Sequence, residues 1–213
     1  MPSLLDAFKD DSYRIGDAQA ILYDRTRTAI FPPGYIGQLY WKMQGSMYSN
    51  RDGDGMLRMA FPGFSDFSWD AITLFLLQRP LVVMGIWSGD KFEAAGIGYP
   101  VISVGHGETE KMCFAGYLMF REWWGSVEAE GLAMLGLCLM FKEWNLSAIH
   151  GTRFPANHLT ARFMRKFGFR DIGTIDKYML CNGKLVPAVV STLLREDFED
   201  YLQRAVGEAY GEE

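Results

Sequence analysis

The pattern of apolar and polar positions predicts a regular series of strands and helices from residue 81 onward. Three runs have the length and apolar content of strands: residues 81–88, 92–104 and 111–120. The sequence Ser88-Gly89-Asp90-Lys91 predicts a hairpin turn between the first two. Gly96 and Gly98 indicate a bulge or a close neighbouring backbone in the second. We therefore expect three consecutive antiparallel strands.

The remaining elements alternate between helix and strand. Helical periodicity at Leu132, Leu135, Leu139 and Met140 predicts a helix over residues 129–144. Further on we expect strands at residues 146–153, 170–180 and 184–194, a turn at Asn182-Gly183, and a helix at 195–206. This order predicts a mixed α/β sheet with a βαβ crossover. The strands 111–120 and 146–153 should form a parallel pair.

A short helix between these last strands carries the clearest local signals. Asn157 can cap it by accepting a hydrogen bond from a backbone N–H group. Leu159, Phe163 and Phe167 repeat every four residues and predict one apolar stripe. Gly168 supplies the left-handed residue that ends the helix.

The first 79 residues are irregular by comparison, with helices predicted at 37–48 and 68–78. We therefore divide the chain into an N-terminal region, residues 1–79, packed on the same domain as a core formed by residues 80–213.

Composition and charge narrow the classes of function. The 213 residues are 49% hydrophobic and 22% charged, which is typical of a soluble globular protein. The longest apolar stretch, 132–141, is too short to span a bilayer, so we expect no membrane segment. A net charge of -5 argues against nucleic-acid binding, which depends on neutralising phosphates.

Cysteine and histidine usage gives no sign of a metal or disulfide framework. The three cysteines stand singly, and the three histidines lack ligand spacing, so we expect no metal. The cysteine usage indicates a reducing cytoplasm.

Two motifs on the short helix, Asn157-x-x-Thr160 and Lys166-x-Gly168-Phe169, resemble the GNAT superfamily of acyl-CoA-dependent N-acetyltransferases. The resemblance is closest to the branch of the ribosomal-protein alanine N-acetyltransferases. Further pieces occur in the order of that branch: Gly116-Tyr117-Leu118, Trp124-Gly125, Phe141, Gly173 and Leu193-Leu194-Arg195-Glu196. The resemblance implies a GNAT fold. Its mostly antiparallel sheet contains a parallel pair of strands that splay apart and admit the pantetheine arm of the cofactor.

The resemblance also implies a function and a set of site residues. The chain would move an acetyl group from acetyl-CoA, as co-substrate, to a primary amine by direct attack. The acceptor would be a small molecule or a protein N-terminus. The thioester would lie against Leu118, Met119, Phe120 and Arg121, and the pantetheine arm against Asn157, Thr160 and Phe163. The pyrophosphate would lie near Ser126, Val127, Glu128, Ala129, Glu130 and Gly131.

The phosphate loop departs from the family pattern. One register puts Val127 at the glycine site and Ala129 at the small final site, whereas another puts Gly131 and Ala133 there. In both, Glu128 and Glu130 bring negative charge close to a pyrophosphate, which costs a few kcal/mol at about 4 Å unless they point away. Alternatively, these carboxylates simply stabilise the helix start.

The catalytic groups are less well marked. Met164 stands where many relatives carry a proton-donating tyrosine. Thr160 keeps a hydroxyl that can bind the cofactor or donate a proton, or else bond its own helix backbone. Glu110 is our candidate base, with His106, Glu108 and Glu122 as further candidates. Alternatively, these are simply polar residues of turns and of the surface.

The basic residues around the short helix, the acyl donor and the oligomeric state each leave alternatives open. Arg162, Arg165, Lys166 and Arg170 would meet the ribose phosphate, or else form a solvated helix face. The chain would act on acetyl-CoA or a bulkier acyl donor, or else be a catalytically silent GNAT-fold binding protein. A homodimer is compatible with its aromatic-rich candidate surface.

Overall fold

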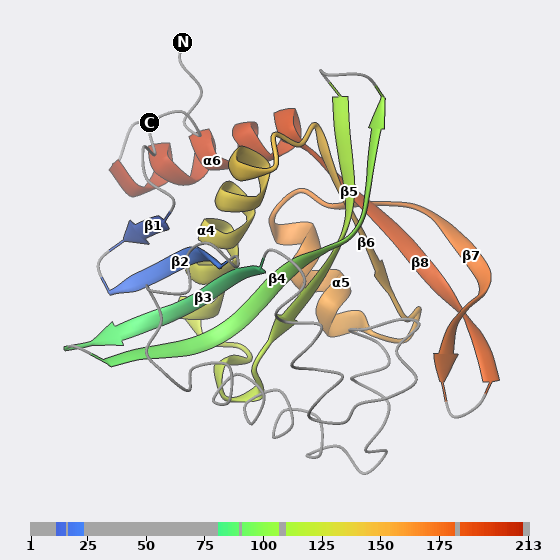
Figure 1. Ribbon diagram of the computed structural model, residues 1–213, viewed down its shortest axis with the longest axis horizontal. Coiled ribbons are helices and arrows are strands. Elements are labelled where there is room, and N and C mark those ends of the chain that lie inside the picture. The colour runs from blue at the N-terminus through green and yellow to red at the C-terminus, as the bar shows by residue number, and fades with distance from the viewer. Residues whose placement is uncertain are drawn as a thin grey trace.

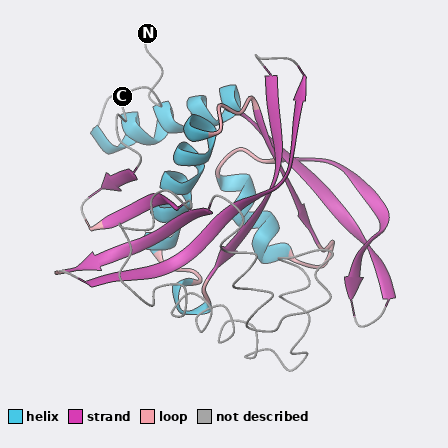
Figure 2. Ribbon diagram, viewed as in Figure 1, coloured by secondary structure: helices cyan, strands magenta, loops and turns pink. Residues whose placement is uncertain are grey.

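The computed structural model describes residues 12–15, 17–23, 81–89, 91–106, 110–181 and 184–210, and these form one twisted sheet with helices (Figures 1 and 2). Its eight strands lie in the order β1-β2-β3-β4-β5-β6-β8-β7. The strands are β1 (Ser12–Ile15), β2 (Ala18–Tyr23), β3 (Leu81–Ser88), β4 (Lys91–His106), β5 (Glu110–Met119), β6 (Ala148–Arg153), β7 (Arg170–Cys181) and β8 (Lys184–Leu194). The helices are α4 (Val127–Glu143), α5 (His158–Lys166) and α6 (Arg195–Tyr210), with a 3-10 turn η3 (Arg121–Trp123).

From residue 81 onward the predicted order is confirmed. The strands β3, β4 and β5 are antiparallel, and β5 and β6 form a parallel pair joined through α4. The predicted irregularity of the second strand is also present, because Met84 pairs with Gly96 while Gly85 pairs with Ala94. One extra residue on β4 therefore forms a bulge there.

The sequence analysis missed two strands in the first half of the chain. β2 pairs with β3 from Ala18↔Ile86 to Tyr23↔Leu81, and β1 extends the same sheet. These strands have only four and six residues, so their alternation is too short to give a clear signal. The helices predicted at 37–48 and 68–78 lie outside the described residues.

The core lies between the sheet and α4, which packs against β2 and β3. The four apolar residues that predicted this helix, Leu132, Leu135, Leu139 and Met140, are all buried. At the other end of the core, the ring of Phe198 on α6 stacks on Phe141 with 5.3 Å between centroids. Because apolar burial is the dominant stabilising term, this contact fixes α6 to α4.

The caps of α5 are confirmed, but its predicted stripe is wrong at one position. Asn157 accepts a hydrogen bond from the Thr160 N–H group at 3.1 Å, and Gly168 has a φ of 94°. Phe167 is buried, whereas Leu159 is 76% exposed. A strict four-residue repeat drifts by about 40° per step around a helix with 3.6 residues per turn. The first member of the stripe has therefore turned away from the core.

Candidate active site

Strands β5 and β6 are paired over a short distance and then part. Their register covers three pairs, Met112↔Ala148, Cys113↔Ile149 and Phe114↔His150. Both strands continue beyond these pairs, β5 to Met119 and β6 to Arg153. We call residues 115–119 of β5 and 151–153 of β6 the parted segment. Figure 1 shows the two strands diverging there, with α5 across the opening.

A bulge on β4 explains where the strands part. Pro100 pairs with Ala115 and Ile102 pairs with Phe114, so Val101 is an extra residue on β4. A bulge bends its strand and increases the local twist. This one lies opposite Phe114, the last β5 residue that pairs with β6. The bulge therefore turns β5 away from β6 at that point.

Side chains from α5 pack beside the parted segment. The Phe163 ring lies 6.2 Å from the Tyr117 ring, centroid to centroid. Met164 lies against β6, because a Cβ atom added to Gly151 would come within 2.9 Å of the methionine methyl group. The glycine at position 151 thus lets α5 approach the sheet closely.

Three buried side-chain groups in the described part of the chain have no hydrogen-bond partner, and all three are donors. They are the Tyr117 hydroxyl, the Trp123 indole N–H and the Arg153 Nε–H. Tyr117 and Arg153 belong to the parted segment, and Trp123 follows β5 in η3. Burial raises the pKa of the Tyr117 hydroxyl, so it stays protonated. Native proteins rarely leave buried donors unpaired, so a ligand rich in hydrogen-bond acceptors would account for these three donors.

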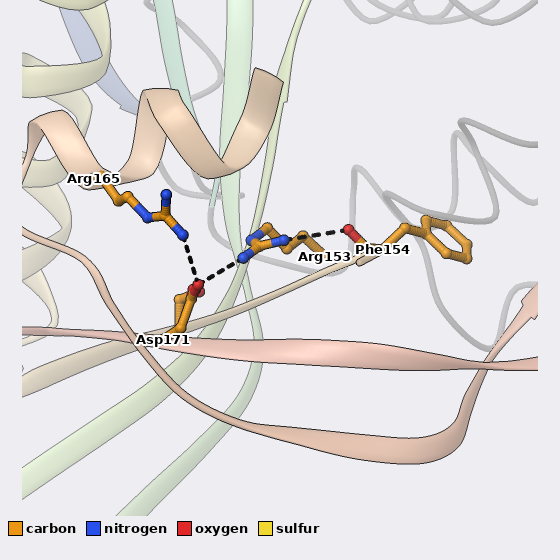
Figure 3. Close-up of polar contacts among 5 residues, drawn as sticks. Arg153, Phe154, Arg165 and Asp171 are labelled. Atoms are coloured by element: carbon orange, nitrogen blue, oxygen red, sulfur yellow. Dashed lines mark hydrogen bonds and ion pairs between the residues drawn. The ribbon is translucent and has the colours of Figure 1, made fainter. Parts of the chain in front are cut away.

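An ion-pair cluster fixes the end of β6 to α5 and β7 (Figure 3). The Asp171 carboxylate accepts hydrogen bonds from Arg153 at 2.7 Å and from Arg165 at 3.1 Å. The Ser191 hydroxyl donates to its other oxygen at 2.6 Å. The Ser191 bond, together with the two guanidinium groups, lowers the pKa of Asp171 against the raising effect of burial. The cluster therefore orients the Arg153 end of the parted segment.

The start of α4 follows β5 after the short turn η3 and presents backbone N–H groups. Ser126 caps this helix, and its hydroxyl accepts a hydrogen bond from the Ala129 N–H group at 3.1 Å. Gly125 has a φ of 76°, which allows the turn into the helix. The predicted phosphate-loop residues Ser126 to Glu130 occupy this cap and first turn, whereas Gly131 lies beyond it. The first turn is the part of a helix that attracts anions.

The acidic residues at this helix start are not equivalent. Glu130 forms an ion pair with Lys166 at the end of α5. Its charge is therefore balanced by a cation on the neighbouring helix, while Glu128 is exposed. Two further residues of the basic set also have carboxylate partners, Arg165 with Asp171 and Arg170 with Asp197.

The structure brings most of the predicted site residues to one end of β5. Leu118, Met119, Phe120 and Arg121 run from the parted segment into η3, and Asn157, Thr160 and Phe163 lie on α5 or at its cap. The candidate base Glu110 is not among them. It begins β5 and pairs with His106, so the paired section of β5 and β6 separates it from the parted segment.

Sequence reasoning gave no role to two residues beside the parting point. Tyr117 appeared only as part of a motif, and His150 only as a histidine without ligand spacing. His150 is in the last β6 pair, and its Nδ1 lies 2.7 Å from the Thr192 hydroxyl oxygen. Burial lowers the pKa of His150, which favours the neutral imidazole. No local pattern marks either residue, because their neighbours are set by the strand register.

Comparisons with solved structures reveal close similarity in fold at low sequence identity. Ribosomal-protein-S5-alanine acetyltransferase from Vibrio fischeri aligns at a TM-score of 0.60 and 17% identity, covering 89% of this chain and 99% of that one. Mycobacterium smegmatis RimJ, solved with CoA-disulfide, aligns at a TM-score of 0.59 and 19% identity, covering 89% and 90%. Spermidine N-acetyltransferase from Vibrio cholerae, solved with CoA and spermine, aligns at a TM-score of 0.59 and 12% identity, covering 84% and 97%.

No protein-family model and no curated protein sequence matches the chain. Among the described residues, no helix combines the length and apolarity needed to cross a membrane. The same residues contain no cluster of three or more His, Cys, Asp or Glu side chains that could hold a metal ion. The parted strands and the structural neighbours together show that the chain has the fold of the GNAT acetyltransferases.

Proposed function

We propose that this protein is an acetyl-CoA-dependent N-acyltransferase that acts on a primary amine. The observation that supports this most directly is the early end of the β5–β6 pairing, bordered by buried donors without partners. A pantetheine arm carries amide carbonyls and a thioester, which are the acceptors that such donors need. The residues present therefore fit this co-substrate.

The chain offers separate surfaces for the parts of acetyl-CoA. The arm would lie along the unpaired edge of β5, next to Asn157, Thr160 and Phe163. The pyrophosphate would lie at the start of α4, where the helix dipole favours negative charge. The pairing of Glu130 with Lys166 supports this placement, because a neutralised carboxylate repels phosphate less.

The chemistry follows from the bound thioester, which supplies an activated acetyl group. A neutral amine attacks the carbonyl carbon, and N–H groups on the edge of β5 that does not pair with β6 stabilise the oxygen as charge develops on it. Thr160 would contact the arm or donate a proton. If Glu110 were the base, the proton would have to reach it through water molecules around the paired strands. His150, whose pKa is lowered by burial, lies where the strands part. We therefore add His150 to the candidate bases.

The acceptor is proposed from the chemistry of the structural neighbours. Their names give spermidine and an alanine of ribosomal protein S5. Spermidine carries primary amines, and an alanine presents one where it is the first residue of a chain. A small-molecule amine and a protein N-terminus are therefore the two acceptor classes to compare.

A catalytically silent binding protein is the second candidate. Met164 supports it, because its side chain, which lies against β6 at Gly151, has no proton to donate. This protein would bind CoA at the same site without releasing thiol from acetyl-CoA.

Calorimetry with acetyl-CoA, paired with a thermal-unfolding scan, tests the proposal. We expect saturable heat and a rise in melting temperature that grows with ligand concentration. Release of free CoA should then be measured with spermidine and with a peptide that begins with alanine. Absence of binding at millimolar acetyl-CoA would refute both candidates, whereas binding without thiol release would favour the silent protein.

A further inference from the structure

Tyr117 places a hydroxyl group at the centre of the parted segment. It lies on β5, three residues beyond Phe114, the last residue paired with β6. Together with Ala115 and Met119 it packs toward the core cluster that contains α4, and its ring contacts Phe163 of α5. Tyr117 is therefore on the helix-covered face of β5, beside α5.

The hydroxyl group costs stability where it lies. It is buried and has no hydrogen-bond partner in the described part of the chain. An unpaired buried polar group costs about 1–3 kcal/mol, so phenylalanine would serve packing better at this position. A tyrosine with no structural use for its hydroxyl suggests a use in binding or chemistry.

The state of the hydroxyl defines what it can do. Because burial raises its pKa, the group remains a phenol throughout the pH range in which proteins are studied. It can donate a hydrogen bond to a developing negative charge. It would not transfer its proton completely to a weaker base.

We propose that the Tyr117 hydroxyl donates a hydrogen bond to the thioester sulfur of the acyl donor and stabilises that sulfur as it leaves. This inference rests on the proposed function. Beyond Phe114 the backbone of β5 has no pairing with β6, so N–H groups on that edge can serve the carbonyl oxygen, which leaves the sulfur to the side-chain donor. The amine nitrogen forms the new C–N bond, the C–S bond breaks, and its electron pair remains on sulfur. The amine loses its proton to a base, and solvent later protonates the thiolate.

The test uses Tyr117→Phe, which removes one oxygen atom and keeps the ring contact with Phe163. We expect the kcat for CoA release to fall about a hundredfold or more, as when one oxyanion-hole donor is removed from an enzyme. The melting temperature should stay equal or rise, because an unpaired buried group has been removed. Tyr178→Phe is the matched control, since Tyr178 packs in a separate cluster with Phe154 and Ala188.

A second measurement reads the sulfur contact without turnover. The ultraviolet absorbance of the CoA thiolate, followed against pH in the complex, reports the pKa of the bound thiol. Donation from Tyr117 should lower that pKa relative to free CoA in the wild-type protein and in Tyr178→Phe, and Tyr117→Phe should abolish the shift.

The outcomes separate the two proposals. A wild-type protein that does not bind CoA overturns the proposed function and this inference together. If the wild-type protein binds CoA and acetylates, two results would each overturn the role of Tyr117 alone. One is an unchanged kcat in Tyr117→Phe, and the other is a thiol pKa in the wild-type complex equal to that of free CoA. The titration of the wild-type complex decides the question even where Tyr117→Phe fails to fold.

Discussion

The Asp171 side chain shows how one residue holds three elements at the candidate site. It joins Arg153 on β6 and Arg165 on α5 (Figure 3), and it also accepts a hydrogen bond from Ser191 on β8. Arg153 is only 7% exposed, so its charge depends on this partner. Removing one member of a buried pair leaves the other charge uncompensated, and this usually costs more than the pair contributes.

We predict that Asp171→Asn destabilises the protein by about 2 kcal/mol at pH 7. This figure is below that for a fully buried pair, because Asp171 is 34% exposed and solvent screens its charge. Urea unfolding monitored by circular dichroism measures the difference. Asp197→Asn provides the control, since its partner Arg170 is 63% exposed and the loss should stay below about 1 kcal/mol.

The same variant carries a pH signature. The pKa of Asp171 is lowered in the folded protein, so its stabilising effect is complete above the unfolded value of about 3.9 and is lost as pH falls toward the folded value. The difference between wild type and Asp171→Asn should therefore be constant near neutrality and shrink below about pH 4. A difference that does not change with pH would show that the loss comes from packing.

At the scale of elements, local signals predicted the ends of helices better than their faces. The cap at Asn157 and the left-handed Gly168 depend on atoms within a few residues, and both are present. The orientation of Leu159 depends on how α5 meets the sheet, which sequence spacing alone does not define. The ion pair between Glu130 and Lys166 similarly joins residues far apart in the chain.

Gly131 distinguishes the two registers proposed for the phosphate loop. It lies inside α4, beyond the first turn, and a Cβ atom added there would meet no atom within 4 Å. We predict that Gly131→Ala stabilises the protein by about 1 kcal/mol, because alanine has the higher helix propensity.

Calorimetry on the same variant tests the site. If the free N–H groups of the first turn hold the pyrophosphate, the affinity of Gly131→Ala for acetyl-CoA should equal that of wild type. A large loss of affinity in a more stable protein would instead favour the register that uses Gly131 and Ala133.

On the scale of the whole molecule, one core cluster runs from β2 to α6. Phe198 is fully buried in it and stacks on Phe141 near the end of α4 that is farther from the site. We predict that Phe198→Ala costs about 3–5 kcal/mol and lowers the melting temperature of a single transition. Acetyl-CoA should raise the melting temperature of wild type and variant by similar amounts, because distant effects add.

Circular dichroism and tryptophan fluorescence should report this transition at one midpoint. Two separated midpoints would show that α6 and its neighbours unfold independently of the rest. A loss of stabilisation by acetyl-CoA in the variant would show that the two ends of α4 are energetically coupled.

The sequence predicted the order of elements from residue 81 and the parallel crossover. These follow from periodicity and chain order, which are local or topological. It did not predict β1 and β2, which are short, or the roles of Tyr117 and His150. Those roles depend on a one-residue bulge opposite Phe114 and on where a strand register ends.

That short register has a mechanical consequence. Five strands lie on one side of the line between Phe114 and His150, three lie on the other, and only three residue pairs join them. This is the shortest register between neighbouring strands of the described sheet, so the fewest backbone pairs oppose a change of angle there. A molecule inserted between the parted strands would hold the two half-sheets apart, and its thickness would set the angle between them.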